Sequence, residues 1–165
     1  MRHWLTLATA DDADAVAGLR NAVAALLTGR HGIGHWSSTS TARGVRSSMR
    51  RSSVYVARDD GHVVGTLVLQ TKKPRAIDRR YFTPVERPLY LLGMAVDPAH
   101  QRTGIGRRCL DEAIAICKAW PGDSLCLDAY DADAGAGDFY RRCGFAEVGR
   151  ATDQHTPLIY FERLV

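Results

Sequence analysis

The sequence predicts an α/β fold in which helices cover both faces of a central sheet. The main evidence is an apolar and aromatic run at 89–96, which has the composition of a strand buried on both faces. This run leads through a glycine-containing turn at 101–106 into a helix with apolar residues along one stripe. Strand-like segments separated by polar turns flank this central unit, so the chain alternates between strands and helices.

The segment before the central unit combines strands with two helices. Strands are expected at 4–9, 54–58 and 63–71, and helices at about 12–28 and in the residues up to about 51. Asp11 or Asp12 can cap the first helix, because a side-chain oxygen there accepts from the free amides of the first turn. Residues 59–61 tolerate a left-handed backbone, which predicts a hairpin turn between the second and third strands.

Two further segments complete the expected fold. Residues 72–88 hold several prolines and no clear period, so they form a loop longer than about 12–15 residues, a length that is often functional. Pro121 and Gly122 break the chain after the central helix. Strands are then expected at 125–130, 145–150 and 157–164, with a helix at 134–143. Gly144 would end that helix as a left-handed cap.

The composition is that of one soluble globular domain spanning residues 1–165. Hydrophobic residues make up 45% of the chain and charged residues 24%, which are ordinary values. A chain of 165 residues buries roughly two-thirds of its unfolded surface. No apolar run approaches the roughly 20 residues of a membrane span, and the apolar start of the chain is too short for a secretory signal. We therefore expect no membrane association.

The positions of the cysteines and histidines and the net charge limit which metals, coenzymes and macromolecules are expected to bind. The cysteines are Cys109, Cys117, Cys126 and Cys143. They show no C-x-x-C spacing and lie in apolar surroundings, so buried thiols in a reducing, cytoplasmic compartment are expected. The six histidines form no ligand cluster, so no metal site is expected. A net charge of +4 mildly favours a polyanionic partner, and because no nucleic-acid motif accompanies it, a coenzyme is favoured over DNA or RNA.

The turn at 101–106 has the features of an anion-binding site. Gly104 and Gly106 let the backbone approach a ligand without interference from a Cβ atom. The first N–H groups of the next helix lack internal partners and lie at the positive end of its dipole, which suits a pyrophosphate. A Walker loop would need a lysine followed by a hydroxyl residue, which this turn lacks. A dinucleotide fingerprint would need a third glycine where Cys109 stands.

Two motifs resemble signatures of the GNAT superfamily, the acyl-CoA-dependent N-acyltransferases. Q-R-T-G-I-G at 101–106 is similar to its Q/R-x-x-G-x-G/A turn. The second motif resembles N-x-x-A-x-x-x-Y-x-x-x-G-F and consists of Asp133, Ala136, Tyr140, Gly144 and Phe145. Helical spacing would place the first three of these on one helix face. The two motifs stand in the family's order and together cover about residues 89–145.

The resemblance implies a mixed, mostly antiparallel sheet with one splayed pair of strands, and acetyl-CoA as co-substrate. The family binds pantetheine and polarises the acetyl carbonyl with backbone groups that correspond here to Met94, Ala95 and Val96. The pyrophosphate would lie on Gln101, Arg102, Thr103, Gly104, Ile105, Gly106 and Arg107. Asp133 replaces the family's asparagine on the pantetheine arm, and an ionised aspartate only accepts hydrogen bonds. Tyr140 corresponds to the tyrosine that faces the coenzyme sulfur, which makes it the candidate acid.

Direct acyl transfer also needs a base for the acceptor amine. Deprotonating a lysine-like amine, with a pKa of about 10.4, costs about 4–5 kcal/mol at pH 7. The strand at 89–96 has no acidic residue, although many relatives place a glutamate there. Asp128, which shares a strand face with Tyr130, could bind or deprotonate the amine, or equally cap local backbone. His35 and Trp36 lie in the loop where the family builds its acceptor pocket, although a solvated or packed histidine is the commoner case.

These inferences predict an N-acetyltransferase that moves an acetyl group from acetyl-CoA to a primary amine in a ternary complex. An acyl-enzyme on Cys126 or Cys143 is disfavoured, because a buried thiol without a basic partner is a poor nucleophile. The acceptor is open between a small amine, an amino acid derivative and a protein or peptide N-terminus, and a homodimer is compatible with the resemblance. The alternatives are a non-catalytic acyl-CoA sensor or interaction module and, further behind, a nicotinamide-dependent enzyme.

Overall fold

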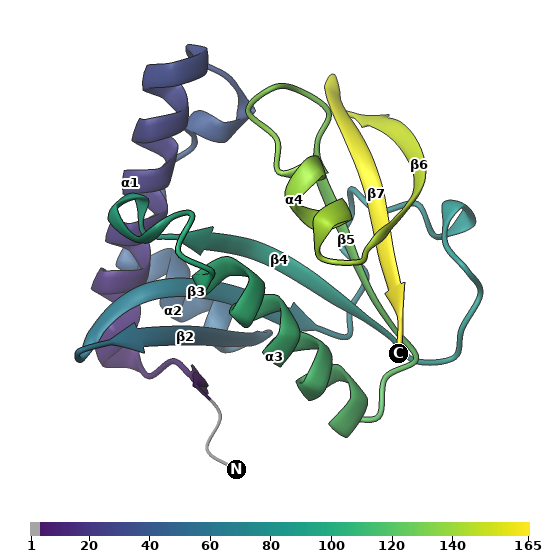
Figure 1. The fold of residues 1–165 in the computed structure, drawn as a ribbon, viewed down its shortest axis with the longest axis horizontal. Helices are drawn as coiled ribbons and strands as arrows, with labels where there is room; N and C mark the ends of the chain where they lie inside the picture. Colours follow the sequence, from purple (N-terminus) through teal and green to yellow (C-terminus); the bar gives the residue numbers. More distant parts are fainter. Residues whose placement is uncertain (1–3) are drawn as a thin grey trace. The chain divides into compact units, whose positions relative to one another are not determined.

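The computed structural model describes residues 4–165 and contains a mixed α/β fold (Figure 1). Its seven-stranded sheet has the order β1-β2-β3-β4-β5-β7-β6 in the described part of the chain. The strands are β1 (Leu5–Leu7), β2 (Ser53–Asp59), β3 (His62–Gln70), β4 (Pro88–Val96), β5 (Ser124–Tyr130), β6 (Ala146–Asp153) and β7 (Thr156–Leu164). β1–β2, β2–β3, β5–β7 and β6–β7 pair antiparallel, whereas β4 and β5 are parallel. The predicted mixed, mostly antiparallel sheet is therefore confirmed.

The helices connect these strands within two compact units. They are α1 (Ala13–His31), α2 (Ala42–Met49), α3 (Ile105–Ala119) and α4 (Gly137–Arg142). The first unit comprises the chain up to Leu69 together with Gly93–Ala113, and the second comprises Gln70–Leu92 and Ile114–Val165. β4 and α3 are each divided between the two units. Residues 93–96 and 105–113 belong to the first unit, and residues 88–92 and 114–119 belong to the second.

In the first unit, helices lie on both faces of the β2–β3 hairpin (Figure 1). Val56 of β2 is fully buried against residues of α1 and α2, namely Ala13, Val16, Ala17 and Val45. The next residue, Ala57, points to the opposite face because successive strand side chains alternate. It pairs with Gly65 of β3, where an added Cβ would lie 3.3 Å from Cys109 Sγ of α3. The predicted arrangement of helices on both faces is thus present in this unit.

The second unit is built on β5, β7 and β6, and successive residues of β7 face different neighbours. Phe161 is fully buried, and its ring lies 5.9 Å from that of Tyr140 on α4. The adjacent Tyr160 packs in a separate cluster with Ile77 and Phe82 of the segment between β3 and β4. That segment is the predicted long loop, and in the structure it contains a single short 3₁₀ turn, Arg79–Tyr81. It covers one face of the unit while α4 covers the other.

Buried polar contacts anchor this loop to β7. The Glu162 carboxylate accepts from the Thr83 backbone N–H at 3.1 Å and from the Thr83 hydroxyl at 2.5 Å. The Tyr160 hydroxyl donates to the Ala76 carbonyl and accepts from the Asp78 amide at 3.3 Å. Glu162 is 6% exposed, so its charge depends on these donors for compensation.

β4 and β5 pair only at their starts. The register runs from Pro88↔Ser124 to Tyr90↔Cys126, although both strands continue well beyond these residues. The predicted splayed pair of strands is therefore confirmed. Beyond the paired part of β4, Gly93 adopts a φ of +56°, which a residue with a side chain rarely accepts.

Two predicted helix starts differ from the structure. Asp12 does not cap α1 through its side chain but accepts from the Thr9 amide at 2.8 Å and pairs with Arg58. α4 begins at Gly137 rather than near residue 134. An added Cβ at Gly135 would lie 1.9 Å from the Tyr130 carbonyl oxygen, so the chain passes too close to β5 there for a regular helix. Asp133 consequently lies in an exposed turn, and the expectation that it shares a helix face with Tyr140 is wrong.

Candidate active site

The turn between β4 and α3 is held in shape by its own side chains. Asp97 accepts from the Ala99 amide and lies 3.0 Å from His100 Nδ1, which fixes the 3₁₀ turn Pro98–His100. Gln101 Nε2 donates to the Val96 carbonyl at 3.1 Å, and the Thr103 hydroxyl donates to the His100 carbonyl. These contacts fix the backbone from the end of β4 to the start of α3 without any ligand.

Two left-handed residues direct this turn into α3. Arg102 has a φ of +61° and Gly104 a φ of +89°, and α3 begins immediately afterwards at Ile105. An added Cβ at Gly104 would meet nothing within 4 Å, so glycine is required for its backbone conformation rather than for packing. The first amides of α3 have no intrahelical acceptors, and the exposed Arg102 and Arg107 add positive charge beside them. This arrangement can bind a pyrophosphate.

The end of β4 supplies the other predicted coenzyme contacts in the first unit. Met94, Ala95 and Val96 are all half-buried, and the Asp97 amide donates to the Val64 carbonyl of β3 at 2.9 Å. The Val96 carbonyl is already engaged by Gln101. Among the backbone groups predicted to bind pantetheine, the Val96 carbonyl thus already accepts a hydrogen bond within the turn.

His35 and Trp36 lie in a 3₁₀ turn after α1 in the same unit. The Trp36 indole donates to the Gly32 carbonyl at 3.0 Å, and its ring meets that of His31 edge-on with centroids 6.3 Å apart. His35 is exposed. Both residues therefore lie in a hydrogen-bonded turn. Their contact with the acceptor stays a prediction.

The sequence reasoning missed Arg20, a charged residue on the apolar stripe of α1. Its neighbours at helical spacing, Val16 and Ala24, are buried, and Arg20 itself is half-buried. An added Cβ at Gly93 would lie 3.0 Å from Arg20 Nη2, so the guanidinium lies against β4 directly before Met94. The sequence signal that could have identified Arg20 is a charged residue placed four residues after Val16 and four residues before Ala24 on an apolar helix stripe.

Tyr140 lies in the second unit within an aromatic cluster. It is 7% exposed, and its ring centroid lies 5.4 Å from that of Phe139, 5.8 Å from that of Phe145 and 5.9 Å from that of Phe161. Burial raises the pKa of the Tyr140 phenol well above its usual value, and the nearby Asp128 and Cys143 raise it further. The hydroxyl is therefore protonated at every physiological pH and is available only as a neutral donor or acceptor.

Asp128 lies on β5 in the same unit, opposite Tyr160 of β7. Burial raises the pKa of its carboxyl group, and the Asp153 carboxylate adds to the rise. In turn, burial and the charge of Asp128 raise the pKa of Tyr130. A carboxylate whose pKa has moved toward neutrality is a stronger base than an exposed one. Asp128 thus has the property that a general base requires.

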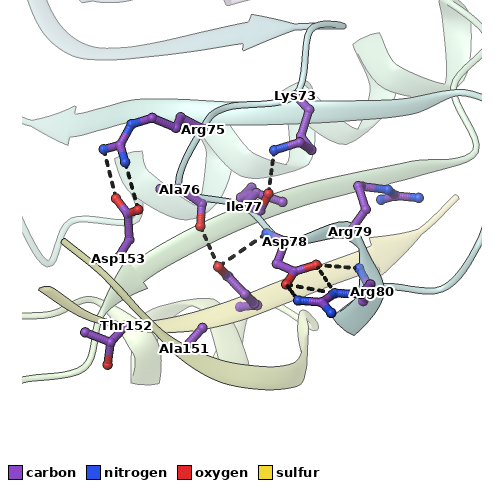
Figure 2. A pocket seen from close by; sticks show the side chains of 11 residues that line it. Lys73, Arg75, Ala76, Ile77, Asp78, Arg79, Arg80, Ala151, Thr152 and Asp153 are labelled. Carbon is purple, nitrogen blue, oxygen red and sulfur yellow. Dashed lines mark hydrogen bonds and ion pairs between the residues drawn. The ribbon is translucent and has the colours of Figure 1, made fainter. Parts of the chain in front are cut away.

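A separate pocket of about 570 Å³ lies under the β3–β4 loop of the second unit (Figure 2). Most of its charged side chains are paired, since Arg75 makes a two-bond contact to Asp153 at 2.9 and 3.0 Å and Arg80 contacts Asp78 at 2.6 Å. Hydrogen bonds from Arg80 lower the pKa of Asp78 to about 2. The pocket contains none of the predicted site residues, and its ion pairs hold the loop to β6 and to itself.

The predicted site residues therefore divide between the two units. The first holds Met94 to Val96, the 101–107 turn, His35 and Trp36, and the second holds Asp128, Tyr130, Asp133 and Tyr140. Among residues 4–165, no group of three or more histidine, cysteine, aspartate or glutamate side chains is arranged to hold a metal ion. None of the helices in the described part of the chain is long and apolar enough to cross a membrane.

The fold and the candidate site thus combine a mixed sheet that has one splayed parallel pair with a glycine turn that leads into the N-terminus of α3. The model of the acetyltransferase (GNAT) family matches residues 25–145. Since this match covers most of the chain, the protein belongs to the GNAT family, and the predicted membership is confirmed.

One curated relative agrees with the family assignment. The GCN5-related N-acetyltransferase 10, chloroplastic, of Arabidopsis thaliana is 35% identical over 69 residues, which cover 42% of this chain and 27% of the plant protein. The matched segment thus spans about a quarter of the length of that relative.

Solved structures share the fold at low identity. The ribosomal-protein-alanine N-acetyltransferase of Brucella melitensis has a TM-score of 0.73 at 19% identity, covering 98% of this chain and 99% of its own. The ribosomal-protein-S18-alanine N-acetyltransferase of Escherichia coli has a TM-score of 0.71 at 17% identity, covering 98% and 92%. The protein yncA of Salmonella typhimurium, solved with its cofactor acetyl-CoA, has a TM-score of 0.68 at 18% identity, covering 97% and 92%.

Proposed function

We propose that this protein is an N-acetyltransferase that moves an acetyl group from acetyl-CoA to a primary amine by direct transfer in a ternary complex. The observation that carries the proposal is the Arg102–Gly104 turn, whose left-handed residues lead into the N-terminus of α3 in a chain of the GNAT family. The amides of residues 101–107 bind the coenzyme pyrophosphate, and the backbone of Met94 to Val96 binds pantetheine and polarises the acetyl carbonyl. Asp133, in its exposed turn, accepts a hydrogen bond from the pantetheine arm.

Tyr140 acts on the departing sulfur as a neutral donor. Because burial raises the pKa of its phenol above 10, complete proton transfer to a thiolate of pKa roughly 8.5 is uphill by at least about 2 kcal/mol. The hydroxyl therefore stabilises the developing thiolate mainly through a hydrogen bond. One hydrogen bond to a charged group contributes about 1.5–3 kcal/mol, which corresponds to a tenfold or greater rate effect.

Asp128 acts as the base that removes the proton from the acceptor amine. Its raised pKa predicts that kcat/KM falls as the pH drops through a value above the ordinary aspartate range. Replacing Asp128 with Asn should lower kcat/KM for the amine about 100-fold, a typical contribution of a general base, and should remove this acidic limb. Initial rates measured between pH 5 and 9 test the expectation. Asp138→Asn is the matched control, because it removes an exposed carboxylate from the same unit.

The same substitution should stabilise the folded protein. The folded-state pKa of Asp128 is raised, so its contribution to stability is fully present below the unfolded pKa of about 3.9 and is lost as pH rises through the folded value. At pH 7 the ionised carboxylate therefore destabilises the native state, and Asp128→Asn should raise Tm. A lower Tm together with unchanged kcat/KM would show that Asp128 caps local backbone instead.

A coenzyme thiol-release assay against a panel of amines tests the whole proposal. Acetyl-CoA affinity is measured in parallel by calorimetry. Amine-dependent thiol release, with the acetylated amine identified by mass spectrometry, is the expected result. Tight acetyl-CoA binding without turnover on any amine would instead assign the chain to the class of acyl-CoA sensors.

A further inference from the structure

The guanidinium of Arg20 has two buried donors without a protein partner. Within the part of the chain that the structure describes, Arg20 Nε and Nη2 are the buried side-chain nitrogen or oxygen atoms for which no hydrogen bond is made. Leaving charged donors unsatisfied in the interior is costly, and such groups are generally paired in native proteins. Burial also lowers the pKa of this guanidinium, which reflects the same lack of compensation.

Three carboxylates of the first unit have partners other than Arg20. Asp12 pairs with Arg58, and Asp97 contacts His100. Glu112 accepts from the backbone amides of Trp4 and Leu5 at 3.1 and 2.7 Å. None of these contacts involves the Arg20 guanidinium, whose Nε and Nη2 keep their capacity to pair with an anionic group.

The two unpartnered atoms lie on one edge of the guanidinium. The Nε–H and Nη2–H bonds on that edge point in nearly the same direction, so they form the fork that binds both oxygens of a carboxylate. Gly93 keeps this edge uncrowded, since an added Cβ would lie 3.0 Å from Nη2 and 3.7 Å from Nε. Gly93 is itself exposed, so the guanidinium lies behind an accessible stretch of β4.

We propose that Arg20 binds the carboxylate of the acceptor and that the acceptor is a free amino acid. This inference rests on the proposed function, which assigns the acetyl carbonyl to the β4 backbone from Met94 onward. Because Arg20 lies against Gly93, the residue before Met94, the acceptor's anionic group and its reacting amine must be close together. An α-amino acid has this spacing, whereas the N-terminal residue of a protein has its own carboxyl group tied up in a peptide bond.

Matched pairs of amino acids and their primary amides test the substrate class. With the wild-type protein, kcat/KM should be at least 10-fold higher for the acid than for the amide of the same amino acid. Arg20→Met should lower kcat/KM for the acid about 100-fold, mainly through KM, and leave the amide unchanged. Arg20→Lys keeps the charge but loses the paired donors of the guanidinium. Its kcat/KM for the acid should therefore lie between the values of the wild type and of Arg20→Met.

The control is Arg30→Met, which removes an exposed arginine from the same helix and should behave like the wild type. If Arg20→Met lowers the rates for acid and amide equally, Arg20 has a structural role and the inference is wrong. If the wild type prefers amides, or aminophosphonates to aminocarboxylates, the assigned substrate class is wrong while the acetyltransferase function stands.

Thermal denaturation gives a readout that does not depend on turnover. Without ligand, Arg20→Met should raise Tm, because an uncompensated buried charge is replaced by an apolar chain of similar length. In the presence of coenzyme A, a panel of free α-amino acids is added at saturating concentration, and those that bind should raise the Tm of the wild type but not that of Arg20→Met. If no amine is acetylated, the proposed function fails, and this ligand-induced shift still decides whether Arg20 binds a carboxylate. Equal shifts in both proteins would overturn the inference.

Discussion

Replacing Gly104 with valine is expected to abolish measurable acetyl-CoA binding. Gly104 has a φ of +89°, and a β-branched residue held in that region is strained by about 1–3 kcal/mol. The strain is relieved by rotating the peptide groups on either side of residue 104, which turns the amides away from the pyrophosphate. In addition, a branched side chain would project into the open space above the turn, where the phosphates are proposed to lie. Calorimetry should show a loss of affinity of at least about 100-fold, or about 2.7 kcal/mol.

Gly61→Val is the matched control for this substitution. Gly61 lies in the β2–β3 turn of the same unit with a φ of +78°, and an added Cβ there also meets nothing within 4 Å. The control should therefore suffer a similar backbone strain and a similar fall in Tm while binding acetyl-CoA normally. Undiminished coenzyme binding by Gly104→Val would remove the 101–107 turn from the proposed phosphate site.

Tyr140→Phe is expected to lower kcat at least tenfold with acetyl-CoA affinity nearly unchanged. The substitution removes only the hydroxyl and keeps the ring that packs on Phe145 and Phe161, so the fold of the second unit should persist. The lost hydrogen bond forms to charge that develops during the reaction, and its removal therefore changes kcat rather than ground-state binding. Steady-state kinetics and coenzyme calorimetry on the same preparations separate the two quantities.

The pH dependence of the rate and a control substitution at a second tyrosine complete the test of Tyr140. Because the phenol has a pKa above 10, its ionisation adds no alkaline limb below pH 9, and the wild-type and Tyr140→Phe profiles should be parallel there. Tyr90→Phe removes another buried hydroxyl from the same unit and should retain wild-type kcat. If Tyr140→Phe turns over at the wild-type rate, the phenol has no part in the reaction.

The order of strands and helices was predictable because each element carries a strong local pattern. β4 has an unbroken apolar run, and its bounds were predicted to within a residue. The apolar stripe after the glycine turn predicted that a helix follows there, and α3 does. The start of α4 was not predictable, because it depends on how closely Gly135 approaches the Tyr130 carbonyl. That distance is a property of the tertiary fold and leaves no periodic signal in the sequence.

The candidate site was predictable where it is built from backbone. The glycines and the free amides of the turn were expected from the residue types and from the helix that begins next to them, whereas the left-handed conformation at Gly104 was not predicted. Side-chain environments were not predictable in the same way. The burial of Tyr140 depends on Phe161, which is distant in sequence, and the unpaired guanidinium of Arg20 becomes evident only when its neighbours in space are known.

The reactivity of the cysteine thiols can be used to follow unfolding of the protein. All four are free and buried, and burial raises the pKa of Cys109 and of Cys117 to about 11. Such groups are therefore much less ionised near neutral pH than an ordinary exposed thiol, and the thiolate is the reactive form. A chromogenic disulfide reagent should therefore develop colour slowly with the intact protein and rapidly once denaturant exposes the sulfhydryls.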